Sequence, residues 1–121
     1  NVVFVDQSRK AVRMIRQNLD GLQICDGYRV LEMDLSRALD RCARDGGAFD
    51  VAFIDPPYER DHVYAETLQA FADSPLLSPD GVLIFEHSKK MDLPETAGEL
   101  RKYRVLTQGD SVLSFYRKED R

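Results

Sequence analysis

The sequence predicts an α/β fold with a mostly parallel β-sheet, and two patterns support this prediction. Short apolar runs rich in β-branched residues alternate with segments whose apolar residues recur at helical spacing. Three of the apolar runs end directly in an aspartate, at Asp6, Asp34 and Asp55. Parallel strands place their carboxyl ends at one edge of a sheet, where α/β proteins bind their ligands. We therefore expect these three carboxylates to gather at that edge.

The expected elements follow one another in a regular order along the chain. Strands are predicted over residues 2–5, 28–33, 49–54, 82–86, 103–107 and 111–117, and helices over residues 35–43 and 63–72. A further helix, capped by Ser8, should run to about residue 19, with one apolar face formed by Ala11, Val12, Ile15 and Leu19. The third strand is apolar almost throughout, which is typical of a strand buried on both faces. Residues 78–81 are expected to form a turn, and residues 95–100 at most a short helix. The last two strands flank Gly109 and should form an antiparallel hairpin at the edge of the sheet.

Composition narrows the class of protein. The chain has 121 residues, which is one domain's worth, and 31% of them are charged. The formal net charge of −4 argues against a stand-alone nucleic-acid binder, because phosphate contacts need lysine and arginine. No apolar stretch approaches the length of a membrane span, and nothing resembles a signal peptide. We therefore expect a cytoplasmic, monomeric protein without a membrane partner, and the cysteine and histidine spacing predicts no metal.

Asp55, Pro56, Pro57 and Tyr58 form a stiff acidic loop directly after the third expected strand. Each proline fixes its own φ and lacks an N–H, and the residue before a proline is pushed towards extended geometry. The Asp55 carboxylate and the Pro56 carbonyl can therefore accept hydrogen bonds from both N–H groups of an exocyclic amine on a base. Held in this way, the nitrogen would aim its lone pair at a methyl donor while the Tyr58 ring stacks on the base.

Each of these features also has a simpler explanation. A single aspartate after a strand is commonly a helix cap, and Asp-Pro often begins an ordinary surface turn. Three aspartates at equivalent strand ends favour a site, since the last is held in a proline-stiffened loop and followed by a tyrosine. We therefore predict that the catalytic residues are Asp55, Pro56, Pro57 and Tyr58.

At this motif the sequence resembles the Rossmann-like, S-adenosylmethionine-dependent amino methyltransferases, whose signature is Asp or Asn, then Pro-Pro, then Tyr or Phe. More narrowly, it is similar to the bacterial 16S ribosomal RNA guanine-N2 methyltransferase family. The similar blocks are residues 3–6 with 9–12, 53–58, 86–90, and 103 with 109–116. The resemblance implies a class I methyltransferase fold, S-adenosylmethionine as cofactor, and methylation of a guanine N2 amino group in small-subunit ribosomal RNA.

The resemblance also implies roles for residues of the cofactor site. Asp6 would accept hydrogen bonds from the cofactor ribose, and Gln7 would lie near the adenine. Asp34 would bond the adenine amino group, with Leu35 packing on the ring. Asp55 would border both the cofactor and the target guanine.

Five further residues are candidates for contact with the substrate. Arg60, Lys89 and Lys90 could touch RNA phosphates, and Glu86 and His87, at a strand end, could line the site. For each of them a purely structural or solvent-exposed position is the alternative.

The sequence departs from the family at its beginning. The family starts with a strand and a glycine-rich loop that cradles the cofactor, and none of the seven glycines here forms such a loop. The chain also opens inside an apolar strand, without Met. We therefore expect residues 1–121 to be a partial class I methyltransferase domain. Its first strand should lie upstream and insert between the strands of residues 2–5 and 49–54, and a basic upstream segment would answer the charge objection.

Two alternatives to this function stay open. The Asp-Pro-Pro-Tyr motif alone also fits a DNA adenine-N6 methyltransferase, which would use the same chemistry on another base. A chain of this length could instead be an inactive fragment that needs its N-terminal part.

Overall fold

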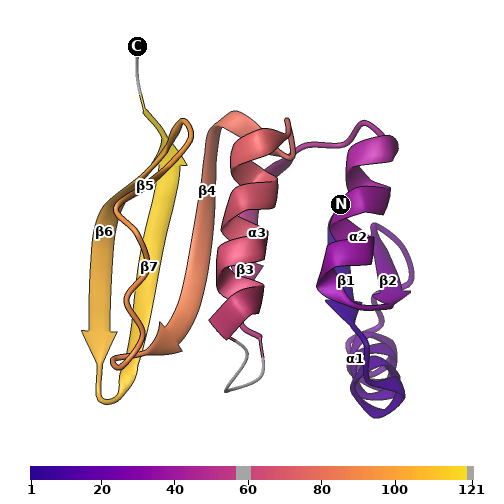
Figure 1. Cartoon of the computed structure of the whole chain (residues 1–121). Coiled ribbons are helices and arrows are strands. Elements are labelled where there is room, and N and C mark those ends of the chain that lie inside the picture. The colour runs from indigo at the N-terminus through magenta and orange to yellow at the C-terminus, as the bar shows by residue number, and fades with distance from the viewer. Residues whose placement is uncertain (57–60, 120–121) are drawn as a thin grey trace. The chain divides into compact units, whose positions relative to one another are not determined.

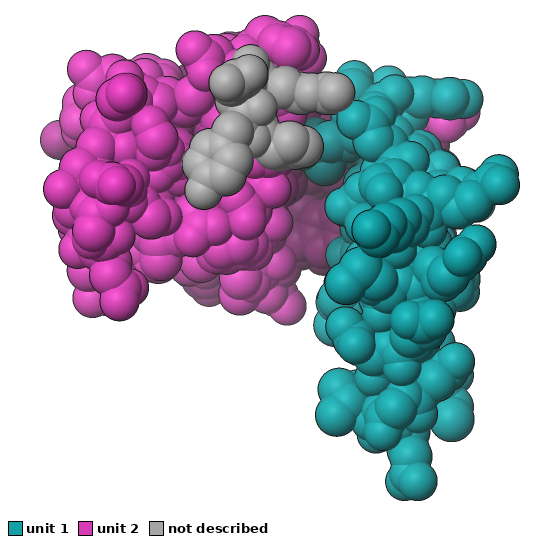
Figure 2. All heavy atoms as spheres, turned by 90° about the horizontal axis from the view of Figure 1, so that it is seen from below, with its two compact units in different colours: residues 1–41 teal, residues 42–121 magenta. Residues whose placement is uncertain are grey.

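The computed structural model describes residues 1–56 and 61–119, and its elements are drawn in Figure 1. The chain divides into two compact units, residues 1–41 and residues 42–121, which are coloured separately in Figure 2. The elements in chain order are β1 (Val2–Asp6), α1 (Arg9–Gly21), β2 (Tyr28–Glu32), α2 (Leu35–Arg44), β3 (Phe49–Ile54), α3 (Asp61–Asp73), β4 (Leu77–Ser88), β5 (Thr96–Ala97), β6 (Leu100–Gln108) and β7 (Ser111–Lys118). Helix α2 crosses the boundary between the units.

The first unit is a β-α-β arrangement followed by the start of α2. β1 and β2 run parallel, with Asp6 opposite Glu32 at their carboxyl ends. Ser8 caps α1, as predicted, because its side chain accepts a hydrogen bond of 3.2 Å from the Ala11 amide. The buried residues of α1 are Val12 and Leu19, and both lie on the predicted apolar face.

The second unit is a five-stranded mixed sheet with the order β3-β4-β7-β6-β5. β3 and β4 are parallel, whereas the other three pairs are antiparallel. α3 covers one face of this sheet (Figure 1), and its Tyr64 ring lies 5.8 Å from that of Phe85. Phe85 in turn makes an edge contact with Tyr116, which is fully buried. These aromatic rings form the centre of the core of this unit.

The α/β class and the C-terminal hairpin are confirmed. β6 and β7 pair in antiparallel register and are joined by a tight turn in which Gly109 has a φ of +62°. This left-handed backbone conformation favours glycine, which explains why the turn falls there.

The expected turn at residues 78–81 lies inside β4 instead. Phe49 pairs with Leu77 and Val51 with Val82, so β4 advances five residues while β3 advances two. The turn-forming residues make an irregular bulge in the strand rather than ending it. Gly81 is required there because a Cβ at this position would lie 2.9 Å from the Phe49 carbonyl oxygen.

Residues 95–100, where at most a short helix was expected, form none: Thr96 and Ala97 pair with β6 through a two-residue turn in which Gly98 has a φ of +57°. One other expectation about this unit is wrong. β3 is not buried on both faces, because the side chains of Val51 and Phe53 are 63% and 55% exposed. The apolar run predicted the strand but could not tell what covers its second face.

Candidate functional site at the carboxyl ends of the strands

Asp55 and Glu86 lie side by side at the carboxyl ends of β3 and β4. The last paired residues of these parallel strands are Ile54 and Phe85, and each carboxylate belongs to the next residue along its strand. The two side chains hydrogen bond to each other. Ser111 at the start of β7 donates a further hydrogen bond of 3.3 Å from its Oγ to Oε1 of Glu86. The carboxyl groups of Asp55 and Glu86 are therefore positioned by three strands, β3, β4 and β7.

This arrangement raises the pKa of Asp55 from its ordinary value of 3.8 to about 6. Partial loss of hydration is the largest cause, followed by the hydrogen bond that protonated Asp55 donates to Glu86 and then by repulsion from the Glu86 charge. Two carboxyl groups can share a hydrogen bond only while one of them carries a proton. The pair is therefore able to hold and release a proton in mildly acidic solution.

The main chain around Glu86 is fixed from the other face of the sheet. Tyr64 of α3 donates a hydrogen bond of 2.6 Å from its hydroxyl to the Glu86 carbonyl oxygen. The Tyr64 ring also makes an edge contact with the ring of His87, the next residue of β4. These contacts with Tyr64 therefore hold the backbone of Glu86 in place.

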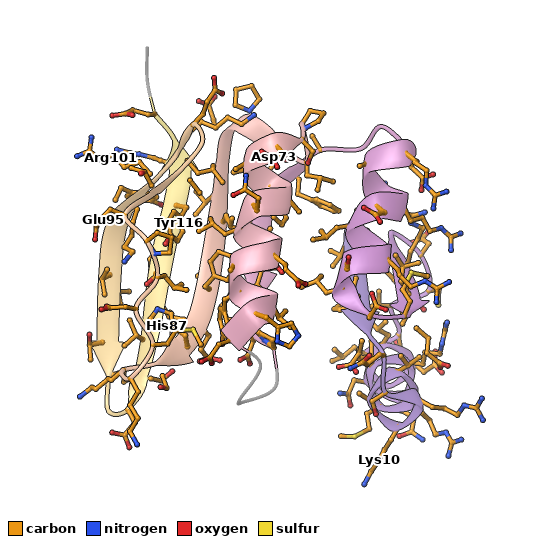
Figure 3. The ribbon with its side chains drawn as sticks, viewed as in Figure 1. Lys10, Asp73, His87, Glu95, Arg101 and Tyr116 are labelled. Atoms are coloured by element: carbon orange, nitrogen blue, oxygen red, sulfur yellow. The ribbon has the colours of Figure 1, made fainter. Side chains whose placement is uncertain are left out.

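His87 is buried within the second unit and is labelled in Figure 3. Its Nδ1 lies 2.9 Å from the Ser88 carbonyl oxygen, which can only accept, so Nδ1 carries the hydrogen. Nε2 then accepts a hydrogen bond of 2.7 Å from the Ser114 hydroxyl. Both ring nitrogens are occupied within the protein, and this favours the structural alternative for His87 over the expected substrate contact.

Lys89 and Lys90 follow β4 at the same end of the sheet as Asp55, and both residues are exposed. Their main chain is anchored, because the Lys89 amide donates to the Asp110 carbonyl oxygen and the Lys90 amide to the Ser88 hydroxyl. The main chain of both lysines is thus held at the end of the sheet where Asp55 lies, and their exposed side chains are available to a phosphate.

The first unit brings Asp6 and Asp34 together at the carboxyl ends of β1 and β2. The Asp6 carbonyl accepts a hydrogen bond of 3.1 Å from the Met33 amide, which precedes Asp34. One carboxylate oxygen of Asp6 accepts from the Ser8 amide at 2.8 Å, and one of Asp34 accepts from the Arg37 amide at 2.9 Å. Asp34 therefore caps α2, whereas Asp6 fixes the turn that leads into Ser8, the cap of α1. Each carboxylate has a second oxygen that can also accept.

Gln7 and Leu35 lie next to these aspartates. Gln7 is exposed, and Leu35, half-buried, is the first residue of α2. Carboxylate acceptors with an adjacent exposed amide and an aliphatic side chain suit a ligand that carries hydroxyl groups and a flat ring.

The remaining expectations concern residues that the structure does not place. Pro57, Tyr58 and Arg60 lie outside the described residues. Asp6 and Asp34 belong to one unit and Asp55 to the other, so the gathering of all three stays a prediction.

Among residues 1–56 and 61–119, no group of three or more potential metal ligands occurs. No helix in that part of the chain is long and apolar enough to cross a membrane.

The pairing of Glu86 with Asp55 was not predicted from sequence. Glu86 was a candidate for lining the site, but the residue that faces Asp55 depends on the register of β3 and β4. That register is shifted by the bulge of β4 described above. The only signal in the sequence is that an acidic residue ends each of two successive apolar runs.

Comparison with known proteins identifies the family of this chain. The Bacillus subtilis (strain 168) protein named "Putative rRNA methyltransferase YlbH" is 33% identical over 116 residues, covering 96% of this chain. The chain spans 62% of the length of that relative. A Streptococcus pyogenes structure entitled "conserved hypothetical protein" superposes with a TM-score of 0.86 at 31% identity, over 97% of this chain and 71% of that one.

A more distant structure, "A putative sam-dependent methyltransferase from Streptococcus mutans", shares the fold. Its TM-score is 0.75 at 11% identity, and the match covers 94% of this chain and 37% of that one. The family model described as Conserved hypothetical protein 95 matches residues 1–117. The sheet with its carboxylate pair is thus part of a Rossmann-like methyltransferase fold, and the chain belongs to the Conserved hypothetical protein 95 family.

Proposed function

We propose that this protein transfers a methyl group from S-adenosylmethionine to the exocyclic N2 amino group of a guanine in small-subunit ribosomal RNA. The observation that carries the proposal is the position of Asp55 and Pro56 at the carboxyl end of β3, beside Glu86. The name of the Bacillus subtilis relative supports an RNA substrate, and the resemblance of the sequence supports guanine N2.

The acceptors of the first unit fit the proposed cofactor. Ribose hydroxyls and an adenine amino group are hydrogen-bond donors, and the free carboxylate oxygens of Asp6 and Asp34 can accept from them. Gln7 and Leu35 would complete the adenine side of this site. The cofactor, when bound, supplies an electrophilic methyl group on a sulfonium.

Asp55 and Pro56 orient and activate the nucleophile, which is the exocyclic amine. Their oxygens accept hydrogen bonds from the amine, which orients its lone pair and favours the positive charge that develops on nitrogen. One proton must leave that nitrogen when the N–C bond forms and the S–C bond breaks. A carboxylate whose pKa is about 6 can take this proton and pass it to water near neutral pH.

The proposed partner of this protein is the small ribosomal subunit. Its proposed location is the cytoplasm, since ribosomes are made there. Lys89 and Lys90 would contact phosphates on the RNA backbone. Pro57 and Tyr58 would contribute rigidity and base stacking, and Arg60 a further phosphate contact, as expected from the sequence. A monomer is sufficient for this chemistry.

The test uses the protein as its gene encodes it, with labelled S-adenosylmethionine and under-methylated small ribosomal subunits. Nucleoside mass spectrometry should find N2-methylguanosine, and an Asp55→Ala variant should lose at least about 100-fold in transfer. Unchanged transfer by Asp55→Ala would contradict the mechanism. N6-methyladenosine formed from DNA would favour the alternative substrate. In a separate calorimetric experiment, failure of the isolated chain of residues 1–121 to bind S-adenosylhomocysteine would favour an inactive fragment.

A further inference from the structure

The Asp55–Glu86 pair presents two carboxyl groups to one small region at the ends of β3 and β4. Asp55 is exposed and follows β3 directly, while Glu86 is half-buried and held by Ser111. Tyr64 holds the Glu86 main chain, and the hydrogen bond from Ser111 holds the Glu86 carboxyl group itself. A ligand that reaches Asp55 therefore also meets the Glu86 carboxyl group.

The hydrogen-bonding edge of a purine distinguishes guanine from adenine at this point. Guanine carries its N2 amino group next to N1–H, so two neighbouring atoms both donate. Adenine carries its N6 amino group next to a bare N1, so a donor stands beside an acceptor. A base taken out of its helix is recognised through this edge.

Two carboxylates side by side are two acceptors, and they match guanine alone. Facing adenine, the second carboxylate would meet the lone pair of N1, and one of the two acceptors would lose its hydrogen bond and repel the base. The shared proton would have to leave the pair before guanine binds, because both N–H groups of the base then take its place. Water accepts that proton, and no covalent step is involved.

We propose that Glu86 is a specificity-determining residue, which accepts a hydrogen bond from guanine N1–H while Asp55 accepts one from the N2 amino group. This inference rests on the proposed function and adds to it the residue that excludes adenine. It gives Glu86 a role in contact with the base, where the sequence left open whether this acid lines the site or only fixes the loop.

Glu86→Gln tests the inference because it keeps the shape of the side chain and adds an N–H donor. The substrate is the small subunit reassembled around ribosomal RNA that carries either guanine or 2-aminopurine at the methylated position. 2-Aminopurine keeps the amino group at C2, but its N1 has no hydrogen. Glu66→Gln is the matched control, since Glu66 is an exposed residue of α3.

The wild-type protein should prefer guanine over 2-aminopurine by roughly 10- to 100-fold. Glu86→Gln should lower this preference at least about tenfold, because its amide can donate to the bare N1. Glu66→Gln should keep the wild-type preference. Any cost of the missing O6 in 2-aminopurine cancels in the comparison between variants.

The outcomes separate this inference from the proposed function. If the wild-type protein forms no N2-methylguanosine at all, the proposed function fails and the inference falls with it. If it forms N2-methylguanosine but Glu86→Gln keeps the wild-type preference, only the inference is overturned. Should Glu86→Gln fail to unfold cooperatively, Glu86→Ala takes its place, because it removes the acceptor for N1–H. It should also lower the wild-type preference for guanine at least about tenfold, and an unchanged preference would overturn the inference.

Discussion

Ser114 of β7 donates a hydrogen bond of 2.7 Å to Nε2 of His87 on the neighbouring strand β4, and both side chains are buried. Ser114→Ala would leave that nitrogen without its donor in a site that water does not reach. We expect a loss of about 1–3 kcal/mol in the free energy of unfolding, measured by urea denaturation. Ser36→Ala, at an exposed position of α2, is the control and should change stability by less than about 0.5 kcal/mol. An equal effect of the two substitutions would show that the buried hydrogen bond contributes nothing.

The pKa of Asp55 predicts an acidic limit to the reaction. Because the pKa is raised to about 6, Asp55 loses its acceptor charge as the pH falls through that value. We expect kcat/KM to rise up to about pH 6 and then level off. Glu86→Gln should move this limb to lower pH, since it removes the charge that repels an ionised Asp55. The pH–rate profiles of both proteins check this, and an unmoved limb would mean that Glu86 does not act on Asp55.

Because its pKa is raised, the ionised form of Asp55 destabilises the folded protein at neutral pH. The folded protein binds the Asp55 proton more tightly than the unfolded chain, where the pKa is near 3.8. The resulting stabilisation is complete below that value and is lost as the pH rises through about 6. Asp55→Asn should therefore be more stable than the wild type at pH 7.5, by up to about 1 kcal/mol because the side chain is largely exposed and screened. Urea denaturation at pH 3.5 should show no such difference.

The bulge of β4 depends on the absence of a side chain at Gly81. A Cβ there would lie 2.8 Å from two Leu77 carbons and 2.9 Å from the Phe49 carbonyl oxygen. Gly81→Ala should therefore cost about 2 kcal/mol or more, because β3 and β4 must move apart. Gly47→Ala is the matched control, since nothing lies within 4 Å of its added Cβ. Thermal unfolding compares them, and equal melting temperatures would show that the bulge tolerates a side chain.

Local patterns in the sequence were sufficient for the elements that are bounded by strong signals. β3 lies where its apolar run stands between a glycine pair and Pro56, and α1 begins after its capping Ser8. β5 was missed because two residues are too few to show a period. A single sequence indicates where a strand runs more reliably than what it packs against.

The candidate site was predictable in part for the same reason. The aspartates at the strand ends could be found because each follows an apolar run. The pairing of Asp55 with Glu86 could not be found, because it depends on the register across an irregular strand. The exposure of Val51 and Phe53 likewise depends on which elements cover β3, and no local pattern encodes this.

Lys89 and Lys90 give the last prediction, which concerns RNA affinity. Both are exposed and follow β4 at the end of the sheet where Asp55 lies. The double variant with alanine at both positions should bind RNA more weakly at every sequence. The plot of log affinity against log salt concentration should become shallower by about 1–2 units of slope, because the variant makes fewer phosphate contacts and so releases fewer counterions when it binds RNA. Filter binding across a salt series measures this, with Lys10→Ala of α1 as the single-charge control. A double variant with the wild-type slope would place the phosphate contacts elsewhere on the protein.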